Sequence, residues 1–313
     1  MAGVLFVSFF VLLLLGVPVA LSIGVAALIA LVKEGMPLML ITQRMFAGTD
    51  SFALIAVPFF ILAGDLMAEG KVSEKLVEFA DAIFGFLKGG LSIVSVLAGM
   101  FFAAISGSGA ATTAAVGTTL VPELKRKGYD EAGAASLIAA SGTIGVVIPP
   151  SVPMIIYAVI ADQSVARLFL NGFLPGVVMG VMLMVIAIVQ AYRRNYPKGT
   201  PFSVRVILRT FKDAIWGLLT PVIILGGIFS GYFTPSEAAV IAVNYAFLVS
   251  LLVYRDLSLK QIYTIMVRSV TTTAIIMFVI ATSAILSWVL ANWNIPTMVA
   301  HAVLSLSENP YMI

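Results

Sequence analysis

The sequence predicts an all-α protein that crosses a membrane several times. Of its 313 residues, 61% are hydrophobic and 11% are charged, and the mean hydropathy is +1.09. A soluble domain carries roughly 25% charged residues, so this composition excludes a soluble enzyme and a nucleic-acid-binding protein. The chain has no cysteine and one histidine, His301. It therefore cannot build disulfides, thiolate or multi-histidine metal sites, or a cysteine nucleophile.

Eight apolar stretches, separated by short polar breaks, account for most of the chain. They cover 4–32, 51–68, 91–121, 132–160, 168–191, 214–230, 238–254 and 269–291. A spanning helix needs about 20 apolar residues, and the first stretch is longer than the apolar region of a signal peptide, about 7–15 residues. We therefore expect one transmembrane domain over 1–313 that begins with a single long helix over 4–32.

The positive charges predict the orientation, because Lys and Arg gather in cytoplasmic loops. We place the N-terminus in the cytoplasm and treat 91–121 as a hairpin that returns to the face it entered. Of the 18 Lys and Arg residues, only Lys33, Arg44 and Arg167 then lie outside. A full crossing at 91–121 would destroy this asymmetry. The charges thus favour a re-entrant hairpin.

Two segments have the spacing of amphipathic helices. Apolar residues recur three or four positions apart over 72–87 and, more weakly, over 257–267. We expect both segments to lie along the cytoplasmic interface as arms. The alternative interpretation is that they are ordinary connecting loops.

Two interrupted segments stand out within the apolar stretches. The hairpin contains SGSGAATTAAVG at 106–117, whose hydroxyls could bind a cation or a carboxylate; a helix-packing face of small residues is the alternative. The next stretch contains three prolines within five residues, 149–153, and these forbid a continuous helix. Non-helical backbone at membrane depth is tolerated only where it is buried in protein or lines a cavity. Two such breaks in succession are typical of the binding site of a secondary transporter.

A weak internal repeat points the same way. Residues 57–74 align without gaps to 220–237, with six identities, and the two copies run in opposite directions on the predicted topology. Opposed copies indicate an inverted repeat. We expect a first repeat over about 4–191 and a second over about 214–313. The second would be incomplete and lack its hairpin, with Asn309-Pro310 as the beginning of one.

These motifs closely resemble the large M-type membrane subunit of the tripartite ATP-independent periplasmic (TRAP) transporters, the DctM family. The resemblance rests on ISGSGAATTAAVG at 105–117, on GYDEAGAASLIAASGTIGVVIPPSVPMIIYA at 128–158 and on TPSEAA at 234–239, and it runs from near Val4 to the end of the chain. It implies an elevator-type transporter in the bacterial inner membrane. This transporter would take up carboxylate solutes, such as C4-dicarboxylates or sialic acid, driven by sodium. It also implies two partners, a periplasmic substrate-binding protein (P-type) and a small four-helix membrane subunit (Q-type).

The resemblance further implies which residues form the site, by matching the hairpin tip and the broken helix. The substrate-binding residues would be Ser106, Gly107, Ser108, Gly109, Thr112, Pro150 and Ser151. The sodium ligands would be Ser106, Ser108, Ser141, Gly142, Thr143, Gly145 and Pro149.

Other classes remain as alternatives. An ion channel would need a continuous polar path, and a scaffold membrane subunit would have no transport site of its own. An intramembrane hydrolase would need a base near the serine of Gly-Ser-Gly at 107–109, and no apolar stretch carries one, so we do not expect an enzyme. Asp65, Glu123 and Glu237 could be intramembrane proton carriers. Each lies at the end of a segment, where a solvated or capping role is the simpler interpretation.

Overall fold

The computed structural model describes residues 2–199 and 201–305, and in these ranges the regular elements are helices, apart from one isolated bridge between Lys88 and Lys198. Contacts along the chain define two compact units. The larger is Phe52–Val270, and the smaller combines Met1–Ser51 with Thr271–Ile313. The predicted hairpin start at Asn309-Pro310 lies outside the described residues.

Helices of membrane-spanning length confirm the predicted class. Within the described ranges, five helices are long and apolar enough to cross a membrane, namely Phe52–Glu69, Val165–Arg193, Val204–Phe229, Pro235–Val253 and Leu259–Asn292. A sixth candidate is a pair of helices, Glu131–Val147 and Val152–Ile160, bent by 42° at a short break. The chain is therefore a multi-pass membrane protein.

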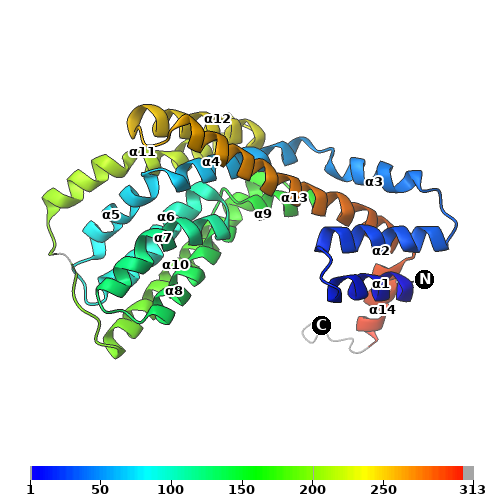
Figure 1. The fold of residues 1–313 in the computed structure, drawn as a ribbon, viewed down its shortest axis with the longest axis horizontal. Coiled ribbons are helices and arrows are strands. Elements are labelled where there is room, and N and C mark those ends of the chain that lie inside the picture. Colours follow the sequence, from blue (N-terminus) through cyan, green and yellow to red (C-terminus); the bar gives the residue numbers. More distant parts are fainter. Residues whose placement is uncertain (1, 200, 306–313) are drawn as a thin grey trace. The chain divides into compact units, whose positions relative to one another are not determined.

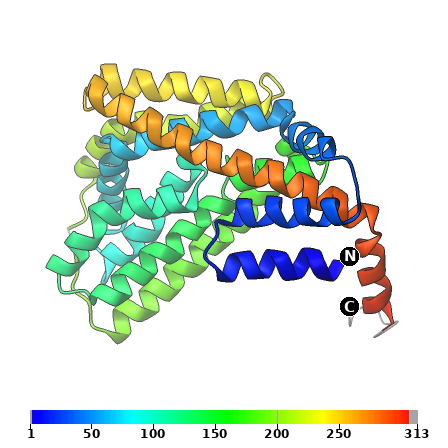
Figure 2. The same ribbon diagram turned by 45° about the vertical axis from the view of Figure 1, so that its right-hand side comes forward.

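The smaller unit contains α1 (Ala2–Leu14), α2 (Val19–Lys33), α3 (Met39–Thr49), most of α13 (Leu259–Asn292) and α14 (Ile295–Leu304). The expected single helix over 4–32 is wrong, because the chain turns between α1 and α2 and the two helices lie side by side (Figure 2). Gly16 adopts a φ of 79° there. Pro18 has no N–H to donate into a continuing helix. The motif Leu-Gly-Val-Pro was the available signal for this turn.

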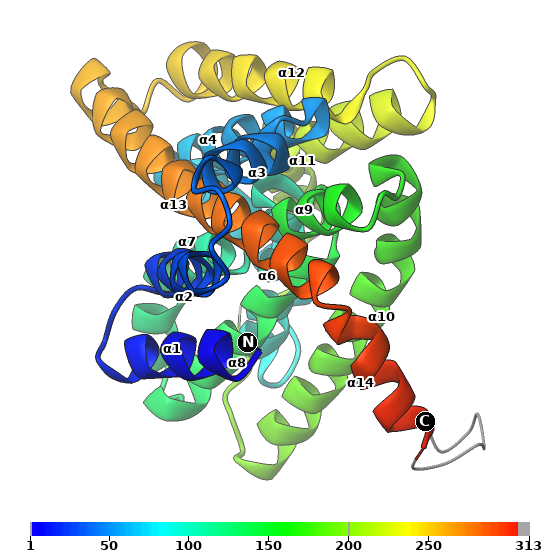
Figure 3. The same ribbon diagram turned by 90° about the vertical axis from the view of Figure 1, so that its right-hand side faces the viewer.

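Small side chains on α2 allow close packing in this unit. Ala26, Ala27 and Ala30 form a core with Leu5 and Leu31 of α1 and α2, and with Ile285 and Val289 of α13. At the end of α13 the chain turns at Asn294, where φ is 53°, and continues as α14 (Figure 3).

The segment 257–267, expected as an interfacial arm, is not a separate helix. Residues 259–267 form the first turns of α13, a helix of 34 residues. No proline or glycine occurs between Leu259 and Asn292, so nothing in the backbone interrupts the helix. The weak amphipathic pattern belongs to the first turns of this long helix.

The larger unit starts with a 3-10 turn, η1 (Phe52–Ile55). Its helices are α4 (Ala56–Glu69), α5 (Val72–Phe84), α6 (Gly90–Ser106), α7 (Gly109–Arg126), α8 (Glu131–Val147), α9 (Val152–Ile160), α10 (Val165–Arg193), α11 (Val204–Phe229) and α12 (Pro235–Leu248), followed by a π turn, η2 (Val249–Val253). The helices α6, α7, α8 and α10 pack together as a bundle in which α6 and α8 contact each other and both of the other helices (Figure 1). Most residues of α6 are buried, so this helix forms the centre of the unit.

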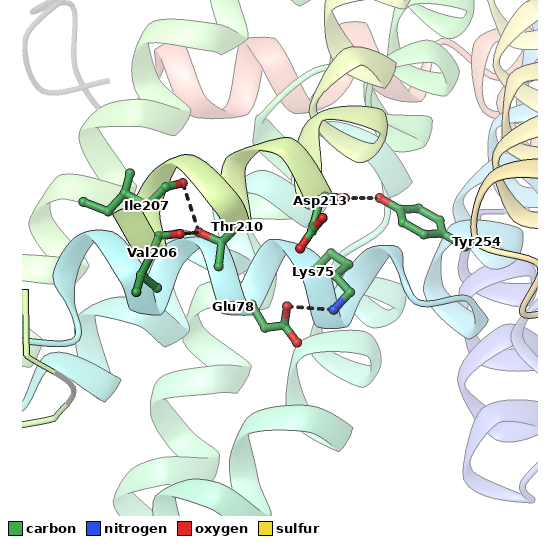
Figure 4. A network of polar contacts seen from close by, with 7 residues as sticks. All are labelled: Lys75, Glu78, Val206, Ile207, Thr210, Asp213 and Tyr254. Atoms are coloured by element: carbon green, nitrogen blue, oxygen red, sulfur yellow. Dashed lines mark hydrogen bonds and ion pairs between the residues drawn. The ribbon is translucent and has the colours of Figure 1, made fainter. Parts of the chain in front are cut away.

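Two further helix pairs belong to this unit. The helix α12 packs along α4, and α11 packs along α5. The predicted amphipathic helix at 72–87 is confirmed as α5, which buries Val72, Leu76, Val77 and Ala80. Figure 4 shows its polar face beside α11, where Lys75 forms an ion pair with Glu78 (2.8 Å). Nearby, the Tyr254 hydroxyl donates to the Asp213 carbonyl (2.6 Å).

Candidate functional site

The predicted hairpin turns at two residues between α6 and α7. Gly107 ends α6 with a φ of 60°, and Ser108 begins α7 in an extended conformation. The Ser108 hydroxyl accepts a hydrogen bond from the N–H of Ala111 (3.3 Å), which is the usual role of an N-cap serine. The turn therefore places the C-terminus of one helix next to the N-terminus of another.

The second predicted break has the same arrangement. α8 ends at Val147, and Ser151 begins α9 by accepting a hydrogen bond from the N–H of Met154 (3.4 Å). Pro149 and Pro150 lack N–H groups, so the carbonyls of Gly145 and Val146 lose the donors four residues further on. The Ser151 hydroxyl donates to the Val146 carbonyl in place of the missing N–H (2.6 Å). The Gly145 carbonyl receives no such substitute from this serine.

The two breaks touch each other directly. The N–H of Val152 donates to the Gly107 carbonyl (3.1 Å). A Cβ on Gly107 would lie 2.5 Å from the Pro150 carbonyl oxygen, closer than Cβ atoms approach other atoms. The hairpin tip and the broken helix are therefore in backbone contact, and glycine is required where they meet.

Glycines also bring α7 and α8 together next to this contact. A Cβ on Gly109 would lie 3.0 Å from the Gly142 carbonyl oxygen, and one on Gly145 would lie 2.8 Å from the Thr112 hydroxyl. The hydroxyls of Ser106 and Thr112 are buried and lie 2.9 Å apart. The groups that meet here are hydroxyls and backbone, and none carries a formal charge.

Two of the predicted ligands lie elsewhere along α8. Ser141 is buried against α6, where a Cβ on Gly99 would lie 2.9 Å from its hydroxyl, and it donates to the Ile138 carbonyl (2.8 Å). The Thr143 side chain is exposed and donates to the Ala140 carbonyl (2.7 Å). The other predicted residues of both sets cluster at the contact of the two breaks.

The structure adds one residue that sequence reasoning missed. A Cβ on Gly64 of α4 would lie 2.9 Å from the Cα of Ser106, so α4 presses against the end of the hairpin's first helix. Gly64 is one of the six identities of the internal repeat, where it matches Gly227. The identity of Gly64 and Gly227 was the one feature of the sequence that could have indicated a role for Gly64.

The ends of four helices give this site its electrostatic character. The C-termini of α6 and α8 present partial negative charge, and the N-termini of α7 and α9 present partial positive charge. A cation is stabilised by the first pair and an anion by the second. Helix ends that meet at breaks of this kind, in a polytopic helical protein, are typical of membrane transport proteins.

The chain belongs to the family "Tripartite ATP-independent periplasmic transporter, DctM component", which it matches over residues 6–313. It is a transporter permease and not an enzyme, as the sequence predicted. The chain is 40% identical over 269 residues to the C4-dicarboxylate TRAP transporter large permease protein DctM of Pseudomonas aeruginosa. The matched region covers 86% of this chain and 63% of that protein.

Two more relatives carry other solute names. The chain is 37% identical over 313 residues to the isethionate TRAP transporter permease protein DctMQ of Oleidesulfovibrio alaskensis, covering 99% of this chain and 49% of that protein. It is 36% identical over 303 residues to the sialic acid TRAP transporter large permease protein SiaM of Vibrio cholerae, covering 96% of this chain and 71% of that protein. The chain thus spans between about half and about 71% of these relatives' lengths.

Proposed function

We propose that this chain belongs to the large permease subunit of a sodium-driven importer in the bacterial inner membrane, whose solute is an organic acid anion. The single observation that carries the proposal is the contact of the two breaks, where the Gly107 carbonyl accepts from Val152. Four helix ends meet there, two suited to a cation and two to a carboxylate. The relatives' names, C4-dicarboxylate, isethionate and sialic acid, support an anionic solute.

Sodium is the ion we assign to this site. Its ligands would be neutral oxygens, and the carbonyls of Gly145 and Pro149 are the best candidates, because Pro149 and Pro153 remove their normal helical donors. The hydroxyls of Ser106 and Ser108 complete the set. The buried site has no side chain to balance a carboxylate, so a bound cation would favour solute binding by supplying that charge.

An inverted repeat and an elevator movement are parts of the same proposal. By the sequence repeat, α4 and α5 correspond to α11 and α12. If the two repeats are exchanged, α4 takes the place of α11 and α12 takes the place of α5. The α4–α12 contact then becomes the α11–α5 contact, and both contacts are present. Such paired contacts are expected from a two-fold arrangement. If an element of the first repeat contacts an element of the second, their counterparts in the opposite repeats must also contact each other. The hairpins and broken helices would then move together against a fixed scaffold.

Two partners complete the proposed transporter. The family description names a tripartite, periplasmic system, which supports delivery of the solute by a periplasmic binding protein of the P-type. The relative named DctMQ supports pairing with a small Q-type membrane subunit. The N-terminus would lie in the cytoplasm, as the loop charges predict.

Uptake in liposomes tests this function. We would reconstitute the permease with its small subunit and binding protein and measure labelled solute with and without a sodium gradient. Gly145→Ala should reduce sodium-dependent uptake at least about tenfold, which corresponds to about 1.4 kcal/mol, since its Cβ would lie 3.0 Å from the Ser108 carbonyl oxygen. Gly117→Ala is the matched control, because its Cβ would have only an ordinary contact of 3.6 Å with Ile138.

Three results would refute the proposal. Equal uptake with and without a sodium gradient would show that sodium does not drive transport. Passive flux that needs no binding protein would indicate a channel. Normal uptake by Gly145→Ala would mean that transport does not use this contact, as expected of a scaffold subunit.

A further inference from the structure

A groove between α8 and α10 lies outside the site described above. Its volume is about 680 Å³. One wall comes from Ser136, Leu137 and Ala140 of α8, and the other is formed by α10 between Leu183 and its C-terminal arginines. Ser136 and Ala140 are small, so they leave space that larger side chains would fill. The residues of α8 that meet α7, such as Gly142, do not line this groove.

The groove changes from apolar to basic along its length. On α10, Leu183, Ile186, Gln190 and Arg193 follow one another at helical spacing and therefore share a face. The helical rise of 1.5 Å per residue puts Leu183 and Arg193 about 15 Å apart along the axis. Val185 and Val189, which are 53% and 47% exposed, leave the groove open along its side.

The two arginines at the basic end, Arg193 and Arg194, differ in whether they form an ion pair. Arg194 forms an ion pair with Asp130 (2.8 Å), and this guanidinium lowers the pKa of the Asp130 carboxyl. The same oxygen of Asp130, Oδ2, also accepts from the N–H of Gly133 (2.8 Å), so Asp130 both pairs with Arg194 and caps α8. Arg193 is exposed and has no ion pair with any residue of 2–199 or 201–305. One guanidinium is therefore available at the groove's end.

We propose that this groove binds one anionic phospholipid, with its phosphate on Arg193 and an acyl chain along Leu183, Ile186 and Ala140. A guanidinium presents paired N–H donors that match phosphate oxygens. Arg193 ends a candidate membrane span, which puts it at headgroup depth. The loop charges predict that this end faces the cytoplasm, and basic pockets between helices on that side bind anionic headgroups. The proposal does not depend on the transport site.

Lipid binding to the purified permease in detergent tests this proposal. Dioleoylphosphatidylglycerol is the probe and dioleoylphosphatidylcholine the neutral control, and bound lipid is counted by native mass spectrometry. Arg193→Gln should raise the apparent dissociation constant for phosphatidylglycerol about fivefold, the effect of one basic residue near an anionic lipid. Arg205→Gln removes the same charge from an exposed position on α11 and should have no effect.

A second pair of variants tests the apolar part of the groove. Ala140→Leu should fill the space beside the acyl chain and lower binding of phosphatidylglycerol, whereas Ala139→Leu changes an exposed neighbour that does not line the groove. Four results would overturn the proposal. They are equal binding of both lipids, equal effects of Arg193→Gln and Arg205→Gln, a response reproduced by inorganic phosphate, and specific cross-linking of Val189→Cys to another subunit or a second copy in membranes.

Discussion

At the scale of single residues, glycine decides whether the hairpin can meet the broken helix. Gly107 has a left-handed φ of 60°, and its missing Cβ leaves room for the Pro150 carbonyl. A side chain at this position would be strained and would also collide with backbone. Backbone cannot move aside as the end of a flexible side chain can, so this position tolerates substitution poorly.

We therefore predict that Gly107→Ala destabilises the protein more than Gly128→Ala. Both glycines have a positive φ, 60° and 82°, but a Cβ on Gly128 would meet nothing within 4 Å. Left-handed strain costs about 1–2 kcal/mol in either variant. Overpacking should add about 1–3 kcal/mol at Gly107 alone. Thermal unfolding of the two variants in detergent measures the difference, and equal midpoints would contradict the close contact.

The acidic residues within the spans illustrate a second point at this scale. Glu237 forms a capping box with Thr234, as its position at a helix start predicted. Asp65 differs, because its side chain is only 15% exposed and accepts from the Ser269 hydroxyl (2.6 Å). Arg268 lies 3.8 Å away and also pairs with Glu69 (2.6 Å). Asp65 thus connects α4 to the first part of α13.

At the scale of elements, the break between α8 and α9 is stabilised by one serine. Ser151 caps α9 through Met154 and, at the same time, donates to the Val146 carbonyl, whose helical donor Pro150 cannot supply. A single hydroxyl therefore satisfies a carbonyl at the end of α8 and an N–H at the start of α9. The same proline pattern that prevents a continuous helix makes this serine necessary.

We predict that Ser151→Ala lowers stability more than Ser164→Ala. Each serine caps a helix by accepting from a backbone N–H, and losing such a cap costs about 1 kcal/mol. Ser151→Ala also leaves the Val146 carbonyl without its donor, which should add about 1–3 kcal/mol in a buried position. The comparison needs only the two unfolding midpoints; a larger loss in Ser164→Ala would refute the double role.

At the scale of the whole molecule, orientation in the membrane can be tested directly. The chain has no cysteine, so single cysteines can be introduced without removing native ones. If 91–121 forms a hairpin, Lys88→Cys and Lys125→Cys should react from the same side with an impermeant maleimide, and Arg167→Cys should react from the other. Labelling of oriented vesicles measures this. Reaction of Lys88→Cys and Lys125→Cys from opposite sides would mean that the segment crosses the membrane once.

The class of protein and the positions of the two breaks follow from the order of residues along the chain. Hydropathy is a local property, so it predicted the spans, and prolines and glycines act on the backbone wherever they occur. The same local rules explain the errors, since the predicted helix over 4–32 ignored Gly16 and Pro18, and the predicted arm at 257–267 lacked any residue that could end a helix.

Which groups contact one another at the site depends instead on the packing of helices that are distant in the chain. The hydrogen bond from Val152 to Gly107, the approach of Gly64 to Ser106 and the position of Ser141 against α6 join residues that are 42 to 45 positions apart in the chain. Such contacts depend on how whole helices pack. Packing is set by the sum of many small side-chain interactions, and no short motif encodes that sum.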